Sequence, residues 1–219
     1  MSRPRNGPQL LSAAARRTLS RRDPLLGKVL KRLPPYPGFP RGAEARLTHY
    51  ESLSRAVVYQ QITGKAAATI LGRVKALTPG SRFPTAPELL ELTEDELRAA
   101  GLSRGKALAV RDLAERIVDG RLRLGGLGRL PDDEVIRRLV TVRGIGVWSA
   151  QMFLMFKLGR LDVFPAGDLG VVEGLRLLDG LDGRPTEKAA WARSEPWAPW
   201  RSATAWAMWR LVDEHRASR

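Results

Sequence analysis

The residues best suited to chemistry lie between Thr141 and Gly170. In Arg143-Gly144-Ile145-Gly146, two glycines flank one aliphatic residue, between the predicted end of one helix and the start of an apolar helix. Glycine permits positive φ and close approach of the backbone to a partner, and the first amides of a helix favour a phosphate. The pattern predicts a phosphate site with Ile145 anchored in the core. An ordinary helix–turn–helix corner is the alternative.

A second candidate is Asp168, which follows Phe164-Pro165-Ala166-Gly167 and precedes an apolar helical segment. From the residues alone, its favoured role is to cap that helix through a side-chain oxygen. The alternative is catalysis, because the helix dipole favours an ionised carboxylate and such a group stabilises positive charge that builds in a transition state. One side chain can serve both roles.

The elements that position these residues are predicted to be helices. Apolar residues recur at helical spacing and strand-like alternation is nearly absent, so the predicted fold class is all-α. Asp23-Pro24 supplies an N-cap and a proline at the first helical position, and Thr93 with Glu96 forms a capping box. The predicted helices cover residues 10–22, 25–33, 49–76 with a break near 63–64, 97–101, 106–118, 131–139, 147–158, 168–178 and 200–216.

A Pro-rich linker at residues 34–41 and a loop at residues 162–167 divide these helices into two predicted lobes. Residues 9–45 pack with residues 165–219 as one lobe, and residues 46–164 form a central lobe with the helical hairpin at 134–158. Residues 1–8 are a frayed tail. A cleft between such lobes is a common place for a ligand.

Composition excludes several classes of function. The 219-residue chain has no cysteine, which excludes disulfides, thiol catalysis, thiolate zinc sites and a cysteine-held iron–sulfur cluster. Its net charge of +14 predicts a polyanionic partner, with nucleic acid first and an anionic membrane surface second. Arginine-rich usage that reflects genome composition is the neutral alternative. Neither a bilayer-spanning apolar run nor a signal peptide is apparent, so we expect no membrane insertion, and the absence of cysteine fits a cytoplasmic protein.

The hairpin and the aspartate together resemble the helix-hairpin-helix (HhH-GPD) superfamily of DNA glycosylases. Other segments resemble its 3-methyladenine DNA glycosylase II branch, and the resemblance runs from about residue 23 to the end of the chain. These segments are Arg55–Thr63, Phe83-Pro84-Thr85, Leu97–Ser103 with Lys106-Ala107, Trp197–Ser202, and the helix with Trp206 and Trp209. The resemblance implies two helical lobes with a cleft, and the chain has no room for the N-terminal β-domain of some relatives.

The resemblance also implies a monofunctional glycosylase of base excision repair. Such an enzyme flips an alkylated base of the 3-methyladenine or 7-methylguanine type, hydrolyses its N-glycosidic bond and leaves an abasic site. Asp168 is the implied catalytic carboxylate, and Gly167 stands where some relatives have a further acid. Trp148 stands where strand-cutting relatives have a lysine nucleophile, and Lys157 is not at that position, so no lyase step is implied.

Further roles follow from the resemblance. Trp148 and Trp209 line the base pocket, with core packing as the alternative, and Gln61 enters the gap left by the flipped base, with a polar loop residue as the alternative. The DNA phosphates are bound by Arg143, Gly144, Gly146 and Trp148, with Arg201 as a helper. Backbone carbonyls of Thr141, Val142 and Ile145 hold a monovalent cation, Na⁺ or K⁺. No cofactor is required, the partner is double-stranded DNA, and the protein is a monomer.

Two other functions remain compatible with the sequence. One is a non-catalytic helix-hairpin-helix module that only binds DNA, although phosphate binding has no use for an acid at Asp168. The other is a glycosylase for oxidised or mismatched bases, against which the absence of the lysine and of cysteines counts. A basic N-terminal helix adds either non-specific attraction to DNA or a solvated face. Its cations are Arg16, Arg17, Arg21 and Arg22.

Overall fold

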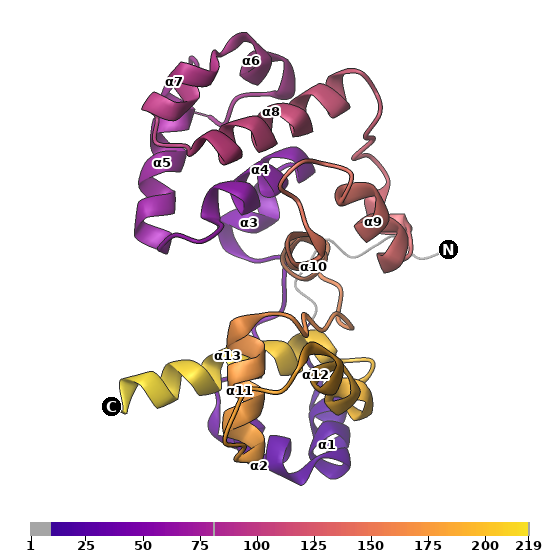
Figure 1. Cartoon of the computed structure of the whole chain (residues 1–219). Coiled ribbons are helices and arrows are strands. Elements are labelled where there is room, and N and C mark those ends of the chain that lie inside the picture. The colour runs from indigo at the N-terminus through magenta and orange to yellow at the C-terminus, as the bar shows by residue number, and fades with distance from the viewer. Residues whose placement is uncertain (1–9, 81, 219) are drawn as a thin grey trace. The chain divides into compact units, whose positions relative to one another are not determined.

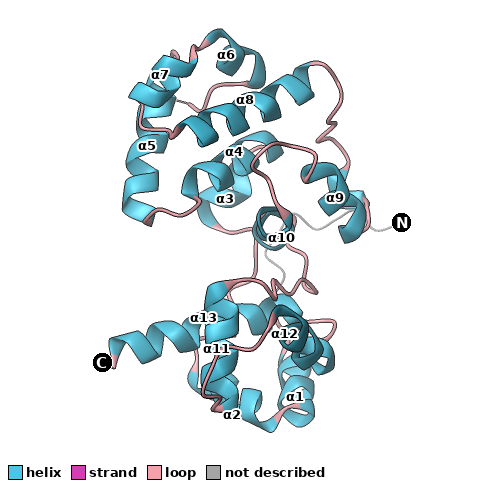
Figure 2. Cartoon of the chain, viewed as in Figure 1, coloured by secondary structure: helices cyan, strands magenta, loops and turns pink. Residues whose placement is uncertain are grey.

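The computed structural model describes residues 10–80 and 82–218, and helices are the only regular secondary structure in that part of the chain. The predicted all-α class is therefore confirmed (Figure 2). The predicted tail at residues 1–8 lies outside the described residues. Among the helices of the described residues, none combines the length and the apolar character needed to cross a bilayer.

The chain divides into two compact units. One comprises Met1–Ala45 with Leu154–Arg219, and the other is Arg46–Phe153. The second boundary lies inside helix α10 (Val147–Phe156), eleven residues before the predicted boundary between residues 164 and 165. The reason is that the ring of Phe156 contacts Phe39 and Trp209, both in the first unit. A cleft between two lobes stays a prediction.

The first unit is built from helices at both ends of the chain (Figure 1). α11 packs chiefly against α13, and α1 packs against α2. Leu19, Phe164 and Trp197 are among its fully buried side chains. The elements are α1 (Ala13–Arg22), α2 (Pro24–Arg32), most of α3 (Gly42–Arg46), α11 (Leu169–Asp179), α12 (Glu187–Ser194), the 3₁₀ helix η2 (Glu195–Trp197) and α13 (Arg201–Ala217).

Asp23 joins several of these elements. Its Oδ1 accepts the N–H of Leu26 at 3.0 Å, which confirms the predicted N-cap, and its Oδ2 accepts Trp197 Nε1 at 2.8 Å. Arg193 Nη1 lies 2.6 Å from the same Oδ2. Burial by itself raises the pKa of Asp23, but hydrogen bonds from Arg193, the Leu26 N–H and Trp197 together hold that pKa below its usual value. The buried carboxylate is therefore ionised and structural.

The second unit contains the hairpin. Within this unit, helix α8 packs against α4, α6 and α7. The predicted stretch 49–76 is two helices separated by residues 60–63, and the predicted Thr93–Glu96 capping box is confirmed. The elements are α4 (His49–Tyr59), α5 (Gly64–Ala76), α6 (Ala86–Glu91), α7 (Glu94–Ala99), α8 (Arg104–Val118), the 3₁₀ helix η1 (Leu127–Arg129), α9 (Asp132–Leu139) and the first part of α10.

Candidate functional site

Residues 140–146 connect α9 to α10 through two successive turns. The N–H of Val142 donates to the carbonyl of Leu139, and the N–H of Ile145 donates to the carbonyl of Val142, both at 3.1 Å. The side chains of Val142 and Ile145 are buried, which confirms the predicted anchoring of Ile145. Two apolar side chains therefore fix the hairpin from the inside, and its exposed backbone faces solvent.

The structural requirement for glycine differs between the two hairpin positions. Gly144 has φ +73°, and a Cβ there would lie 3.0 Å from the Cβ of Ala109 on α8. Glycine is thus required by both conformation and space. Gly146 differs, because its φ is not in the left-handed region and a Cβ there would meet no atom within 4 Å. The small size of Gly146 leaves open space on the exposed side of the turn.

Two polar side chains clamp this hairpin, one from α8 and one from the turn after α4, and sequence reasoning missed both contacts. Asp112 of α8 accepts the N–H of Arg143 through Oδ2 at 2.7 Å, and Gln60 donates through Nε2 to the carbonyl of Gly144 at 2.9 Å. Gln60 also donates to Ser149 Oγ at 3.0 Å. Both sides of Gly144 are thus tied to the body of the second unit before any ligand binds.

Asp112 is held in its charged form. Burial by itself raises the pKa of this carboxyl, but the hydrogen bond from Arg116, the N–H of Arg143, and the charges of Arg116 and Arg121 lower it overall. An ionised acceptor makes a stronger hydrogen bond to the hairpin N–H than a neutral one does.

The start of α10 carries the side chain of Trp148 on the surface. Trp148 is 42% exposed and Val147 is 53% exposed, although both are large and apolar. The first amides of any α-helix have no acceptor within that helix, and they carry the positive end of its dipole. The exposed Arg143 lies in the same hairpin. This surface combines features suited to an anion with an apolar ring.

Gln61 stands at the tip of the turn between α4 and α5. It is exposed and has φ +55°, which makes it the one non-glycine residue with positive φ in the described part of the chain. That conformation costs a residue with a Cβ about 1 kcal/mol or more. Because the preceding residue, Gln60, is bonded to Gly144, the Gln61 tip lies on the hairpin side of the second unit.

Asp168 is the N-cap of α11, as the residues predict. Its side chain accepts the N–H of Val171 through Oδ1 at 2.9 Å. The same oxygen accepts Nε1 of Trp209, on α13, at 2.8 Å. Asp168 is partly exposed, and its neighbours Gly167 and Leu169 are exposed. Asp168 is therefore a partly exposed carboxylate whose Oδ1 is held in place by two donors.

Two residues that position Trp209 were not found by sequence reasoning. The ring of Phe156 stacks on Trp209 with centroids 5.8 Å apart and planes 26° apart. A Cβ at Gly170 would lie 2.7 Å from Trp209 Cδ1 and 3.1 Å from Asp168 Oδ1, so glycine is needed for the indole to reach the acid. A glycine two residues after a capping acid is the signal that could have indicated this contact.

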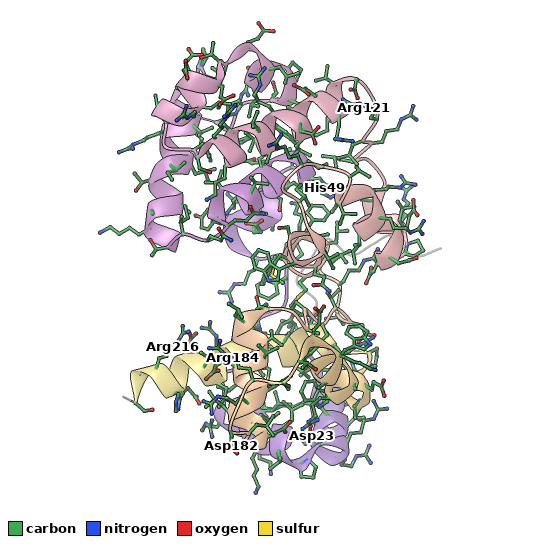
Figure 3. All side chains as sticks on the ribbon, in the orientation of Figure 1. Asp23, His49, Arg121, Asp182, Arg184 and Arg216 are labelled. Carbon is green, nitrogen blue, oxygen red and sulfur yellow. The ribbon has the colours of Figure 1, made fainter. Side chains whose placement is uncertain are left out.

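Other candidates have structural roles. Arg201 forms a two-pronged pair with Asp162 at 2.7 Å through Nε and Nη2, so its expected role as a phosphate helper is not supported. The Nδ1 of His49, labelled in Figure 3, lies 3.0 Å from the carbonyl of Leu124. Its ring meets that of Phe153 edge-on. Within residues 10–80 and 82–218, no group of three or more His, Cys, Asp or Glu side chains could hold a metal ion.

The predicted site residues therefore form two groups. The first unit brings together Asp168 and Trp209, which are 41 positions apart in sequence. The second unit brings the Gln61 turn beside the hairpin with Arg143, Gly144, Gly146 and Trp148. The first group is an acid that accepts a hydrogen bond from an indole. The second group is the N-terminus of α10 and, in a separate turn, Gln61 with its positive φ.

The sequence matches the HhH-GPD superfamily of base excision DNA repair proteins over residues 54–199. That span includes the Gln61 turn, the hairpin and Asp168. The chain belongs to this superfamily. Its expected all-α glycosylase fold is confirmed by solved structures. The chain is similar to the structure of 3-methyladenine DNA glycosylase from Schizosaccharomyces pombe in complex with abasic DNA, with a TM-score of 0.81 and 34% identity. The similarity covers 90% of this chain and 96% of that one.

Two further comparisons also find 3-methyladenine glycosylases. A DNA-3-methyladenine glycosidase from Bacillus halodurans has a TM-score of 0.80 and 28% identity, covering 96% of this chain and 94% of the other. The curated DNA-3-methyladenine glycosylase 1 of Schizosaccharomyces pombe is 38% identical over 151 residues, which is 68% of this chain. The matched segment spans 66% of that relative's length.

Proposed function

We propose that this HhH-GPD chain is a monofunctional DNA glycosylase that hydrolyses the N-glycosidic bond of alkylated bases, of the 3-methyladenine and 7-methylguanine type. The observation that carries the proposal is the Asp168 carboxylate, held at a helix N-terminus by Trp209 and Val171 N–H. Support comes from relatives whose names specify 3-methyladenine glycosylases. A module that only binds DNA would not need an acid fixed in this way.

The proposed chemistry uses the charge of Asp168. As the glycosidic bond breaks, its electron pair leaves with the base and positive charge builds on the sugar at C1′. The carboxylate stabilises that cation, and water adds to C1′ and gives up its proton to the carboxylate or to solvent. A base alkylated on a ring nitrogen is already cationic and leaves as a neutral molecule, so no separate general acid is required.

Asp168 Oδ1 is committed to two donors, Trp209 Nε1 and Val171 N–H. These two bonds fix the direction in which the carboxylate points. We assign Trp209 a positioning role for the acid, because its indole Nε1 donates to Asp168 Oδ1. Its role in the base pocket is proposed on the resemblance, and Phe156 stacks on its ring. The exposed Trp148 is also proposed to contact the base, since an aromatic face attracts a cationic base.

The lysine chemistry of strand-cutting glycosylases is not proposed. An imine with the sugar needs an amine, and position 148 carries an indole. Lys157 lies further along, and its Nζ donates to the carbonyl of Glu44 at 3.1 Å. We therefore propose that the reaction ends at the abasic site.

The hairpin is the proposed phosphate contact. Amides of Gly144, Gly146 and Trp148, with the charge of Arg143, would neutralise the strand that carries the lesion. Gln61, already held in a left-handed conformation, is the proposed residue that fills the space of the flipped base, and its amide can hydrogen-bond the orphaned partner base. We propose that the protein acts as a monomer on double-stranded DNA in the cytoplasm, at the nucleoid if the source is bacterial.

A monovalent cation at the hairpin fits the residues present. The carbonyl of Val142 accepts one hydrogen bond and has a second lone pair, while those of Thr141 and Ile145 accept none from the residues that the structure describes. Backbone carbonyl oxygens are suitable ligands for Na⁺ or K⁺. The bound cation would add positive charge near the proposed phosphate. No further cofactor is proposed, and no iron–sulfur cluster, because the chain has no cysteine.

The proposal is tested by incubating the wild-type protein with duplexes that carry single 3-methyladenine, 7-methylguanine, oxidised or mismatched bases. Free 3-methyladenine and 7-methylguanine are expected products, and treatment with borohydride during the reaction is expected to trap no protein–DNA adduct. Tight binding of methylated DNA without base release would instead support the binding module. Release confined to oxidised bases, or a stable borohydride adduct, would reject the proposed reaction.

A further inference from the structure

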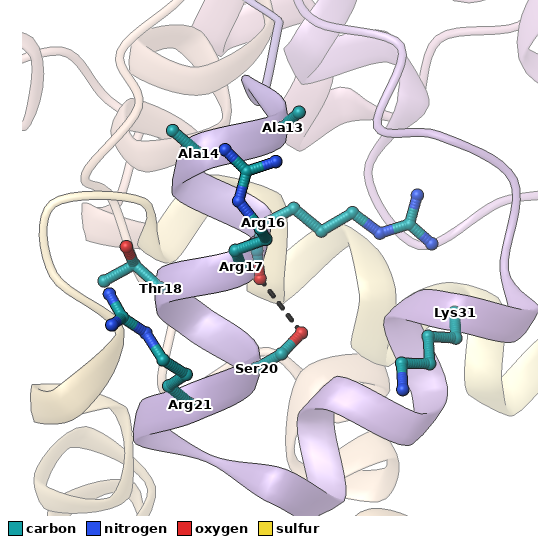
Figure 4. A pocket seen from close by; sticks show the side chains of 8 residues that line it. All are labelled: Ala13, Ala14, Arg16, Arg17, Thr18, Ser20, Arg21 and Lys31. Atoms are coloured by element: carbon teal, nitrogen blue, oxygen red, sulfur yellow. Dashed lines mark hydrogen bonds between the residues drawn. The ribbon is translucent and has the colours of Figure 1, made fainter.

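The first unit carries an open basic pocket on the predicted basic N-terminal helix, formed by none of the residues of the candidate site. It lies on α1 and α2, has a volume of about 680 Å³, and takes its charge from Arg16, Arg17, Arg21 and Lys31 (Figure 4). We call these four residues the α1/α2 basic patch. Arg17, Arg21 and Lys31 are exposed, while Arg16 is half-buried and donates to the carbonyl of Leu30. Ala13, Ala14, Thr18 and Ser20 complete the lining with small side chains.

The cations of this patch are not neutralised within the unit. Residues 13–32 contain seven lysines and arginines and one acid, Asp23. That acid is buried and paired with Arg193. In the described part of the chain, no acidic side chain lies within 4.0 Å of a charged nitrogen of Arg17, Arg21 or Lys31. The patch thus presents unpaired positive charge to solvent.

Other cations on the same helices have evident structural roles. Arg22 donates to the carbonyl of Ala198 at 2.7 Å and lies over the ring of Trp200, and Arg32 pairs with Glu214 at 2.9 Å. The helix dipole favours Arg21 and Lys31, which are in the last turns of α1 and α2. It does not account for Arg16 and Arg17, in the first half of α1. Helix stability therefore leaves part of the patch unexplained.

We propose that the α1/α2 basic patch is a second DNA-binding surface, which contacts the phosphate backbone without regard to sequence. Guanidinium and ammonium groups on small-residue surroundings can approach phosphates closely, and such contacts carry no base recognition. The patch would lengthen the time that the protein stays bound to undamaged DNA between lesions. The unpaired cations indicate a polyanionic ligand by themselves, and the proposed function identifies that ligand as DNA.

The test compares two double variants of equal charge. Arg17→Ala/Lys31→Ala removes patch cations, and Lys188→Ala/Arg216→Ala removes one lysine and one arginine from exposed positions on α12 and α13. Binding of a long undamaged duplex is measured over a salt series. Each phosphate contact contributes about 0.9 to the slope of log K against log salt, so the patch variant should lose about 1.8 of slope and the control should lose little.

Single-turnover base release at saturating methylated DNA should be the same for both variants and the wild type. Equal slopes for the two variants would overturn the proposal, because net charge alone would then explain the effect. Unchanged DNA slopes with lost binding to anionic lipid vesicles would also overturn it, in favour of a membrane partner. If the slopes differ as expected but the wild type releases no base, the patch stands and the proposed glycosylase function fails.

Discussion

Substitution of Gly170 offers a way to disturb the Trp209–Asp168 contact without replacing either residue. In Gly170→Ala, the new Cβ would lie 2.7 Å from Trp209 Cδ1, 3.0 Å from Trp209 Nε1 and 3.1 Å from Asp168 Oδ1. Ordinary van der Waals contact begins near 3.4 Å, so the indole must move by about 0.7 Å. A hydrogen bond of 2.8 Å would be stretched to about its limit by that displacement. We expect Asp168 to lose its indole donor.

The expected result separates activity from stability. A misplacement approaching 1 Å at a reacting group can cost about 100-fold in rate, so base release should fall by about 10- to 100-fold. Helix propensity favours alanine over glycine by up to about 1 kcal/mol, and a partly exposed hydrogen bond to a charged group contributes a similar amount. The two effects oppose each other, so the free energy of unfolding should change by less than about 1 kcal/mol.

The assay is single-turnover release of 3-methyladenine, with thermal unfolding measured in parallel. Gly105→Ala is the matched control, because Gly105 is also the second residue of a capped helix but a Cβ there meets no atom within 4 Å. Trp209→Phe removes the Nε1 donor and keeps a ring, so it should slow base release in the same direction as Gly170→Ala. Wild-type rates in both Gly170→Ala and Trp209→Phe would refute the claim that the indole positions the acid.

Three further predictions follow from single contacts. Asp112→Ala removes the acceptor of the Arg143 N–H, so affinity for undamaged duplex should fall by about 10-fold in a titration; full affinity would show that the clamp is not needed. Gln61→Gly should raise the free energy of unfolding by about 1 kcal/mol, since positive φ suits glycine, yet slow base release; unchanged release would reject its proposed DNA role. Asp23→Ala should lower the free energy of unfolding, measured with denaturant, by about 3 kcal/mol. Because the folded pKa of Asp23 is lowered, its stabilisation is present above the ordinary value of 3.8 and disappears as the pH falls through the folded pKa; a wild-type pH profile in Asp23→Ala would contradict this.

Local signals predicted several helix starts, although α3, α6 and α12 were not predicted and α7 begins at Glu94, three residues before the predicted start. Asp23-Pro24, the Thr93–Glu96 box and the Asp168 cap each depend on residues within three positions, and each has the expected hydrogen bond. The same Thr-x-x-Glu signal at Thr85 and Glu88 forms another capping box that could have been predicted. Such motifs are legible because their geometry is set by the backbone of one helix turn.

Contacts between distant segments were not predictable in the same way. Asp112 meets Arg143 across 31 positions, and Trp209 meets Asp168 across 41. Each depends on how two helices pack, which no local pattern specifies. The difference between Gly144 and Gly146 has the same origin, since the constraint on Gly144 comes partly from Ala109 on α8.

The central claim is that Asp168 carries out base excision, and Asp168→Asn tests it most directly. Asparagine is as good an N-cap as aspartate, so α11 should remain folded, while the charge that faces the sugar cation is lost. Release of 3-methyladenine from methylated duplex under single-turnover conditions should fall by about 100- to 1000-fold, with duplex affinity retained. Release by Asp168→Asn at the wild-type rate would contradict the account.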